Sequence, residues 1–335
     1  MKAPKNLIAY RFKPQRGLDD GLQDAFAAHV IRDPDSLELK TTGFCSPVSS
    51  DSDIVARRLG SCTVFAVAVR SRVIPGAVLS ERAAARVRKR SEERGRPIGS
   101  AERREIRDEI LTDMLATAFV KQSVTTAWLD VHHGWLVVDT SSGTRADAVV
   151  SQLREVFDSF RLISLRSMEA PSMIFADWLQ SKMASDPFEL ANECLLVTSD
   201  GSTWAGKKVD LTSQEIAEHL SAGAHPERLG LSYRDRLGFV LDQDLVIRRL
   251  DLKQAVVDEL SGEETGGDAL AEFDATFTVV TADVAALLDS IAEVFDAEVV
   301  PDDEPLAQRM NVENGGEDEG EDDPEDLKAD ALTMW

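Results

Sequence analysis

Residues 75–119 read PGAVLSERAAARVRKRSEERGRPIGSAERREIRDEILTDMLATAF, a stretch that predicts two helices joined by a short break. Pro75 can open the first helix, because proline is tolerated in the first turn, and alanine and arginine dominate the sequence through Glu93. GRPIGS then interrupts the pattern, and we expect Ser100 to cap a second helix that runs to about Phe119. Apolar residues share one face of that second helix, at Ile106, Ile110, Met114 and Leu115. The two helices should therefore pack as a hairpin with charged outer faces.

This hairpin concentrates the arginines of an acidic chain. The whole protein has a formal charge of −23, with 37 Lys and Arg against 60 Asp and Glu. Residues 1–160 hold 24 basic and 21 acidic side chains (net +3), which leaves 37 − 24 = 13 basic and 60 − 21 = 39 acidic (net −26) for the other residues. Such asymmetry indicates that one part of the chain contacts nucleic acid, although the net charge alone argues against it.

Strands and helices flank the hairpin in irregular order. On the N-terminal side we expect a strand at 5–12, a helix at 18–31 and a buried strand at 61–70; on the C-terminal side, a β-hairpin of 124–131 and 134–140, then a helix at 145–160. Further on we expect a helix after Pro171, strands at 189–200 and 202–211, a helix at 210–223 with a Thr212–Glu215 capping box, strands within 225–252, and a strand followed by a helix within 273–295. Without a regular βαβ alternation, the fold class is α+β with mixed sheets and helices.

The chain divides into four predicted parts. Residues 1–74 together with 120–170 form an N-terminal α+β region, 75–119 the basic helical hairpin, and 171–300 a C-terminal α+β region. Residues 301–335 are an acidic low-complexity tail with nothing to bury, which we expect to be disordered and to compete with DNA for basic groups.

One stretch matches a nucleotide-binding motif in part. GSTWAGKK (Gly201–Lys208) fits the first seven positions of G-x-x-x-x-G-K-[ST], but Lys208 stands where the Mg²⁺-binding hydroxyl belongs. The next helix is predicted to start near Thr212, too late to bring its N-terminus under a phosphate. We interpret this stretch as a hairpin turn that carries two exposed lysines, Lys207 and Lys208.

A second group has the chemistry of metal ligands: Asp130, His132, His133 and Asp139. Adjacent histidines in a turn point apart, and no other Cys or His shows ligand spacing to them, so a polar hairpin tip is the favoured interpretation. The sequence has no G-x-S-x-G elbow, no H-E-x-x-H helix and no Rossmann fingerprint. We expect no catalytic residue, no metal site, no cofactor and no enzymatic activity.

The cysteines and apolar segments indicate a soluble cytoplasmic protein. Cys45, Cys62 and Cys194 are odd in number and form no CxxC pair, which suits a reducing compartment. We expect no signal peptide at the start of the sequence, and the longest apolar run, Thr63–Val69, is too short to span a bilayer.

The basic residues of the hairpin allow two interpretations. A surface helix rich in Arg and Glu is often only a solvated face. Against this, Arg86, Arg88, Lys89 and Arg90 run without an acid between them, and Arg94 and Arg96 flank the break. Arginine offers planar, bidentate donors to phosphate oxygens. No zinc-finger, homeodomain or RNA-recognition signature accompanies them, so base-specific binding is not expected.

Taken together, six segments resemble the bacterial recombination-associated RdgC family over most of residues 1–297. They are KNLIAYRF (5–12), the helical pair of 75–119 with its RGRPIG break, TTAWLDV…GWLVVDTSS (125–142), DLTSQEIAEHLSAG (210–223), LSYRDRLGFVLDQDLVIRRL (231–250) and FDATFTVVTADVAALLDSI (273–291). The resemblance implies a non-enzymatic homodimeric ring whose basic hole admits double-stranded DNA without sequence preference, in the nucleoid, and which restrains a RecA-type recombinase.

The resemblance also implies roles for particular residues. Implied DNA contacts are Arg94, Arg96, Arg103, Arg104 and Arg107 of the hairpin, with Lys207 and Lys208; Phe119 lies where the family makes a subunit contact. Arg86, Arg88, Lys89 and Arg90 join these candidates through the charge of the first helix. The acidic tail, which continues about forty residues beyond the family's usual end, leaves an alternative open: an interaction module that binds a recombinase or another basic partner directly, with weak DNA binding.

Overall fold

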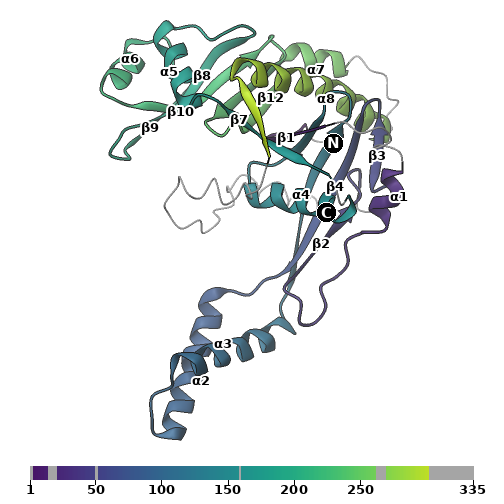
Figure 1. Ribbon diagram of the computed structural model, residues 1–335, viewed down its shortest axis with the longest axis vertical. Coiled ribbons are helices and arrows are strands. Elements are labelled where there is room, and N and C mark those ends of the chain that lie inside the picture. The colour runs from purple at the N-terminus through teal and green to yellow at the C-terminus, as the bar shows by residue number, and fades with distance from the viewer. Residues whose placement is uncertain (1–2, 14–20, 50–51, 158–159, 262–268, 302–335) are drawn as a thin grey trace.

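The computed structural model of the protein describes residues 3–13, 21–49, 52–157, 160–261 and 269–301. In these residues a 13-stranded sheet of antiparallel pairs runs through the body, and a helical arm extends from it (Figure 1). The strands are β1 (Leu7–Phe12), β2 (Lys40–Cys45), β3 (Ala56–Leu59), β4 (Cys62–Arg72), β5 (Val120–Asp130), β6 (Trp135–Asp139), β7 (Leu162–Ser167), β8 (Phe188–Val197), β9 (Thr203–Lys207), β10 (His225–Tyr233), β11 (Leu237–Asp242), β12 (Ile247–Leu252) and β13 (Ala297–Pro301). The helices are α1 (Leu22–Ala27), α2 (Gly76–Arg94), α3 (Ser100–Leu115), α4 (Gly143–Val156), α5 (Pro171–Ser181), α6 (Gln214–Ser221), α7 (Gln254–Ser261) and α8 (Ala269–Val294). The α+β class is confirmed.

The sheet joins the N-terminal and C-terminal parts of the chain through its middle strand. Its order is β2-β4-β5-β6-β1-β12-β11-β10-β8-β9, with β3 beside β4, and β7 beside both β1 and β13. β1 pairs with β6 over Leu7–Arg11 and with β12 at Leu7 and Ile247. The backbone ladder is therefore continuous between the two predicted α+β regions, whose boundaries stay a prediction.

Helices cover the sheet on both faces and bury two large cores. On one face, α4 and α1 pack on an aromatic cluster in which the Phe26 and Phe44 rings stack with centroids 3.9 Å apart. On the other face, α5 and α8 pack over Trp128, Trp135 and the inward residues of β10 and β11. Strand side chains alternate between faces, so residues between these buried positions point away from that core.

The structure corrects the prediction of a strand at the start of 273–295. This stretch belongs to the single helix α8, Ala269–Val294. Its β-branched run TFTVVT favours a strand by local propensity, but apolar residues recur every three or four positions and all face the core: Phe273, Phe277, Val280, Val284, Leu287, Leu288 and Ile291. Over Leu270–Val294 the helix is also long and apolar enough to cross a membrane, yet this apolar face packs on the sheet, as in the core helix of a globular protein.

Other boundaries differ from the predictions at helix ends. Ser100 is the first residue of α3 rather than its cap, the N-cap being Gly99, and α3 ends at Leu115 instead of Phe119. Thr212 does not cap α6, since Ser213 holds the N-cap position without a side-chain hydrogen bond. Asp210 instead accepts hydrogen bonds from the backbone N and Oγ1 of Thr212. α1 is shorter than the predicted 18–31, and of the predicted tail only Pro301 lies within the described residues.

The α2–α3 arm has a small core of its own. Gly95 ends α2 in the left-handed conformation at φ 62°, which costs glycine no steric penalty. Five side chains are buried between the helices and their connection: Leu79, Ile98, Ile106, Ile110 and Met114. The predicted helical hairpin is therefore confirmed.

Arg72 fastens the arm to the sheet. This residue ends β4, and its guanidinium donates to the carbonyl oxygens of Leu115 and Ala118, at 2.9 and 3.3 Å. It also donates to the carbonyls of Pro34 and Asp35 in the loop before β2. A cation beside the last carbonyls of a helix is favourable for two reasons: it donates hydrogen bonds to these carbonyls, and its charge interacts with the negative end of the helix dipole. Arg72 thus sets the direction in which the arm leaves the body.

The described residues have the outline of a crescent (Figure 1). The arm forms one end, and α6 with β9 forms the other, and both ends lie on the same side of the central sheet. One concave side is therefore flanked by two basic segments that are far apart in the sequence.

Candidate nucleic-acid interface

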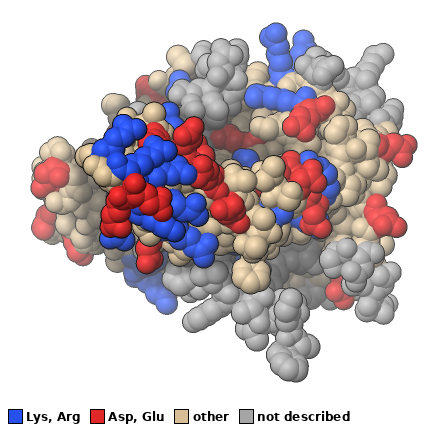
Figure 2. Space-filling model, turned by 90° about the horizontal axis from the view of Figure 1, so that it is seen from below, with Lys and Arg blue, Asp and Glu red and all other residues tan. Residues whose placement is uncertain are grey.

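The nine predicted cationic residues of the arm lie on its outer surface. Arg90 is half-buried and the other eight are exposed. Figure 2, which looks at the molecule from below, shows basic and acidic side chains side by side on the arm instead of a uniformly basic patch. Each cation must therefore be judged by its own partners.

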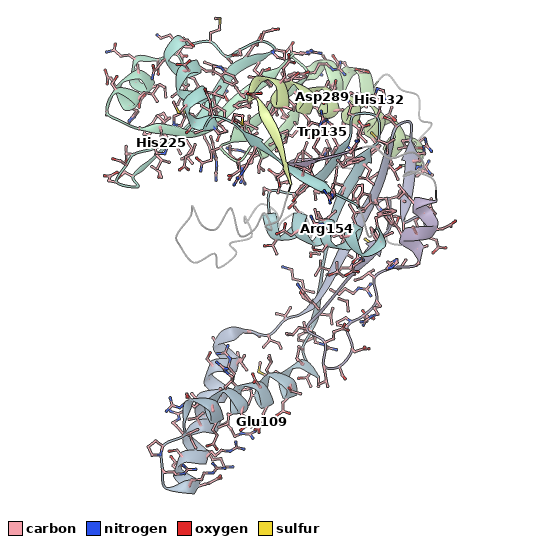
Figure 3. All side chains as sticks on the ribbon, viewed as in Figure 1. Glu109, His132, Trp135, Arg154, His225 and Asp289 are labelled. Carbon is pink, nitrogen blue, oxygen red and sulfur yellow. The ribbon has the colours of Figure 1, made fainter. Side chains whose placement is uncertain are left out.

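Three of the nine are engaged within the arm. Arg94 Nη1 lies 2.6 Å from Glu102 Oε1, and Arg90 lies within 3.9 Å of Glu102 and 3.7 Å of Glu109. Figure 3 shows Glu109 on α3. Arg103 Nε donates to the carbonyl oxygen of Ile98 at 3.1 Å. These side chains brace α2 against α3, so the structure gives them a role in holding the hairpin together.

The other six make no ion pair or side-chain hydrogen bond with any described residue. They are Arg86, Arg88, Lys89, Arg96, Arg104 and Arg107. Their donors face solvent and have the geometry to meet phosphate oxygens without breaking an internal contact. They form the free cationic set of the arm.

Lys207 and Lys208 lie at the other end of the crescent. Thr203–Lys207 is strand β9, paired with β8 so that Lys207 lies opposite Glu193, and both lysines are exposed. No helix follows the lysines until α6 begins at Gln214, and both lysines are exposed as predicted. The hairpin turn lies between Val197 and Thr203, however, and the lysines lie at the other end of β9, so their predicted place on the turn is wrong. Within one chain the structure does not bring these lysines next to the arm (Figure 1).

The structure adds three arginines that the sequence analysis did not single out: Arg228 on β10, with Arg248 and Arg249 on β12. Leu229, Leu241 and Ile247 of these strands face the core under α5 and α8, so Arg228 and Arg248 point to the opposite face. Alternation within IRRL predicts one outward arginine. Only the strand order, however, shows that Arg228 on β10 and Arg248 on β12 lie close to each other, on either side of β11.

The candidate metal ligands at the β5–β6 turn serve the backbone instead. Asp130 Oδ1 accepts hydrogen bonds from the amides of His132 and His133, at 3.0 and 3.1 Å. Asp139 Oδ1 accepts from the amides of Lys5 and Asn6. Within the part of the chain that the structure describes, no group of three or more His, Cys, Asp and Glu is placed to hold a metal ion.

His133 belongs to a polar cluster around Asp289 of α8. Figure 3 labels Asp289 and Trp135 of this cluster. The Asp289 carboxylate accepts from Trp135 Nε1 at 2.9 Å and from Arg11 Nη1 at 3.2 Å, and it lies 2.6 Å from His133 Nδ1. The Arg11 guanidinium also lies over the Trp135 ring, 4.0 Å from its centroid. Because Asp289 joins the helix to β1, β6 and the β5–β6 turn, the cluster fixes α8 on the sheet.

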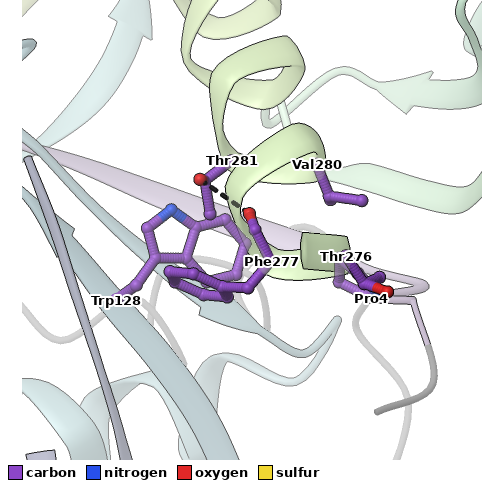
Figure 4. Close-up of a pocket in the computed structure, with 6 residues that line it drawn as sticks. All are labelled: Pro4, Trp128, Thr276, Phe277, Val280 and Thr281. Atoms are coloured by element: carbon purple, nitrogen blue, oxygen red, sulfur yellow. Dashed lines mark hydrogen bonds between the residues drawn. The ribbon is translucent and has the colours of Figure 1, made fainter. Parts of the chain in front are cut away.

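A small crevice between α8 and the sheet offers no reactive groups. It is lined by Pro4, Trp128, Thr276, Phe277, Val280 and Thr281 (Figure 4). The Thr281 hydroxyl donates to the carbonyl oxygen of Phe277 at 2.8 Å, inside its own helix. With apolar walls and no titratable side chain, the crevice has none of the chemistry of an active site.

The cysteines are held as thiols by their surroundings. Burial raises the pKa of Cys45, Cys62 and Cys194 to about 11 in each case. A neighbouring carboxylate acts in the same direction on Cys62 and Cys194, through Asp130 and Glu193. Such thiols are poor nucleophiles at neutral pH.

Phe119 is the most exposed large apolar residue among those described. Its side chain is 87% exposed just before β5, where its carbonyl oxygen accepts from the amide of Val73 at 2.8 Å. Val73 is itself 48% exposed. Phe119 and Val73 thus expose apolar side chains at the base of the arm.

These features define a class: an α+β protein built on one antiparallel sheet, with a projecting helical arm that carries exposed cations. The chain belongs to the RdgC family, whose model, described as "Putative exonuclease, RdgC", matches residues 4–298. The resemblance drawn from the sequence is thereby confirmed.

Curated relatives are matched over nearly their whole length. The recombination-associated protein RdgC of Pseudomonas syringae pv. syringae (strain B728a) is 32% identical over 302 residues, which span 89% of this chain and 98% of that protein. The protein of the same name from Pseudomonas fluorescens (strain Pf0-1) is 31% identical with the same coverage. That from Pseudomonas aeruginosa (strain LESB58) is 32% identical, also over 89% and 98%. The relatives are named for recombination, whereas the family model is named for an exonuclease.

Proposed function

We propose that this protein is a non-enzymatic, sequence-independent double-stranded DNA-binding protein that encircles DNA as a homodimeric ring and modulates, by inhibition, RecA-type recombination. The observation that carries the proposal is the free cationic set on the arm. These six side chains have no partner among the described residues, in a protein whose net charge is −23. Cations that serve only solubility would not be expected to gather on one projection of an acidic chain.

The arrangement favours phosphates over bases. The free cations sit on helix surfaces near a tip, together with glutamates such as Glu105 that would oppose deep entry into a groove. Contacts to phosphates fix position without reading sequence. Sequence-independent binding with strong salt dependence is the expected behaviour.

The crescent outline supports a ring. One chain has basic segments at both ends of a concave side, so two chains related by a two-fold axis could close around a duplex (Figure 1). A closed dimer needs two isologous contacts per chain. Phe119 supplies an exposed apolar anchor for one of them.

A non-enzymatic role is part of the proposal and differs from the name of the family model. It is supported by Asp130 and Asp139, two candidate metal ligands whose carboxylates accept backbone hydrogen bonds. Incubating end-labelled duplex with the protein and Mg²⁺ or Mn²⁺ tests this directly. Release of labelled nucleotides would establish an exonuclease.

The alternative is an acidic module that binds a recombinase or another basic partner directly. The observation in its favour is the net charge of −26 after residue 160. A chain truncated after Pro301 separates the two ideas. Under the DNA proposal it keeps duplex binding, whereas under the alternative it no longer binds the recombinase.

Retention on circular DNA tests encirclement. Protein would be loaded on a nicked circular duplex at low salt and then washed at high salt, which weakens phosphate contacts. A closed ring remains on the circle and is released once a restriction enzyme linearises it. Equal release from circular and linear DNA would exclude encirclement. The proposed location is the cytoplasm, at the nucleoid.

A further inference from the structure

Arg228 is a half-buried cation on β10, on the face of the strand opposite to the core under α5 and α8. It makes no ion pair or side-chain hydrogen bond with the residues that the structure describes. Burial lowers the pKa of its guanidinium, and the positive charge of Arg248 acts in the same direction. Asp242 and Glu227 act in the opposite direction, but burial is the largest cause and the pKa is lowered overall, so the charged form is held at an energetic cost in the free protein.

Asp242 and Glu227 attract the charge of Arg228, but neither carboxylate is hydrogen-bonded to it. Asp242 is the cross-strand neighbour of Arg228, but its Oδ1 accepts from the amides of Asp244 and Val246, at 3.1 and 2.9 Å. Its Oδ2 accepts from Arg248 Nε at 2.7 Å.

Glu193, on β8, pairs with Arg249. The sheet thus pairs Arg248 and Arg249 with carboxylates, whereas Arg228 is only attracted at longer range by Asp242 and Glu227. A partly buried guanidinium whose hydrogen-bond donors have no partner among the described residues has the character of a site for an anion that comes from outside.

We propose that Arg228 binds a backbone phosphate of the DNA, with Arg248 and Arg249 beside it. The inference rests on the proposed function and adds a contact surface on β10 and β12 that is separate from the arm. Phosphate is the fitting anion because the guanidinium fork donates two parallel hydrogen bonds to its oxygens. The duplex would then be held by the sheet as well as by the arm.

The test compares a substitution on β10 with one in the turn that follows this strand. Arg228→Gln and Arg234→Gln remove the same charge, but Arg234 lies beyond the other end of β10, exposed, over the Tyr233 ring. Binding of a fluorescent duplex would be measured by anisotropy across a salt series. Arg228→Gln should weaken binding several-fold at low salt and lower the log–log salt slope by about 0.9 for each phosphate that is no longer neutralised. Arg234→Gln should leave the slope unchanged, and Arg228→Lys should retain most of it.

Stability provides the second readout. Because Arg228 is not paired within the protein, Arg228→Gln should leave Tm unchanged or raise it, whereas a structural role predicts a lower Tm. Equal slopes for Arg228→Gln and Arg234→Gln, or a lower Tm for Arg228→Gln, would overturn this inference. Failure of the proposed function is distinguishable, because the wild-type protein would then bind no duplex at any salt concentration.

Discussion

Arg94 Nη1 and Glu102 Oε1 lie 2.6 Å apart, and this ion pair joins the end of α2 to the start of α3 across the Gly95 break. Arg90 approaches the same carboxylate. A single glutamate therefore holds two of the arginines that the sequence assigned to DNA. The ion pair divides the basic residues of the arm into a bracing group and a free group.

Glu102→Gln should release Arg94 for phosphate, while Arg90 loses one of its two carboxylate contacts and keeps the one with Glu109. We expect duplex affinity at low salt to rise several-fold and the salt slope to increase by up to about 0.9 per released arginine. Partly exposed ion pairs contribute little, so the free energy of unfolding should change by less than about 1 kcal/mol. Glu105→Gln is the matched control, since Glu105 is exposed and makes no ion pair with a described residue. If both variants bind alike, only net charge matters and the bracing role is wrong.

Arg72→Ala should loosen the arm without unfolding it. The substitution removes charged donors from the carbonyls of Leu115 and Ala118, so we expect stability to fall by about 3 kcal/mol. The arm keeps its own apolar core, and its helices should persist. Hydrogen exchange should therefore accelerate at Ala118–Val120 before it does within α3.

The control for this experiment is Arg70→Ala. Arg70 donates to Gln122 and pairs with the exposed Asp33, and it forms no hydrogen bond or ion pair with described residues of the arm. If the hydrogen-exchange rates of residues 118–120 change equally in Arg72→Ala and Arg70→Ala, Arg72 does not fasten the arm.

Phe119→Asp should disrupt assembly. The new carboxylate would be desolvated in an apolar subunit contact, which costs several kcal/mol without a partner. We expect a shift from dimer to monomer, or to an open dimer, in sedimentation velocity. Met173→Asp is the control, because Met173 is 66% exposed on α5, away from the arm. An unchanged dimer that stays on circular DNA would remove Phe119 from the contact.

The thiols should be protected in the folded protein. With pKa values raised to about 11, Cys45, Cys62 and Cys194 remain protonated at pH 8, so reaction with a disulfide reagent should be slow until denaturant is added. Above about pH 9 the unfolded chain releases its thiol protons first and binds fewer protons than the folded chain. Stability should therefore fall as pH rises from about 9 to 11. Three fast-reacting thiols at pH 8 would contradict this account.

The sequence predicted most elements because their patterns are local. Apolar periodicity and the glycine break located α2 and α3, and the buried run at Cys62–Val69 located β4. Sequence reasoning failed at the start of 273–295. The β-branched residues there favour a strand, but the apolar residues that contact the core have helical spacing, and the segment is a helix. The short strand β13 was not predicted, since it depends on its pairing with β7.

The candidate site was only partly accessible to sequence reasoning. The cluster of arginines was visible, but their partners were not, because Arg90 meets Glu109 only when two helices pack side by side. Arg228 gave no signal on its own. Its importance depends on Asp242 being occupied by Arg248, which only the strand order reveals.

The central claim is that the free cationic set of the arm binds duplex phosphates. The most direct measurement is duplex affinity over a salt series for the wild-type protein and for the triple variant Arg96→Gln, Arg104→Gln, Arg107→Gln. The account predicts steep salt dependence of duplex affinity for the wild type. In the variant, the log–log salt slope should be lower by about 0.9 for each phosphate that is no longer neutralised. Affinity should fall equally for all DNA sequences. Equal slopes and affinities in the two proteins would contradict it.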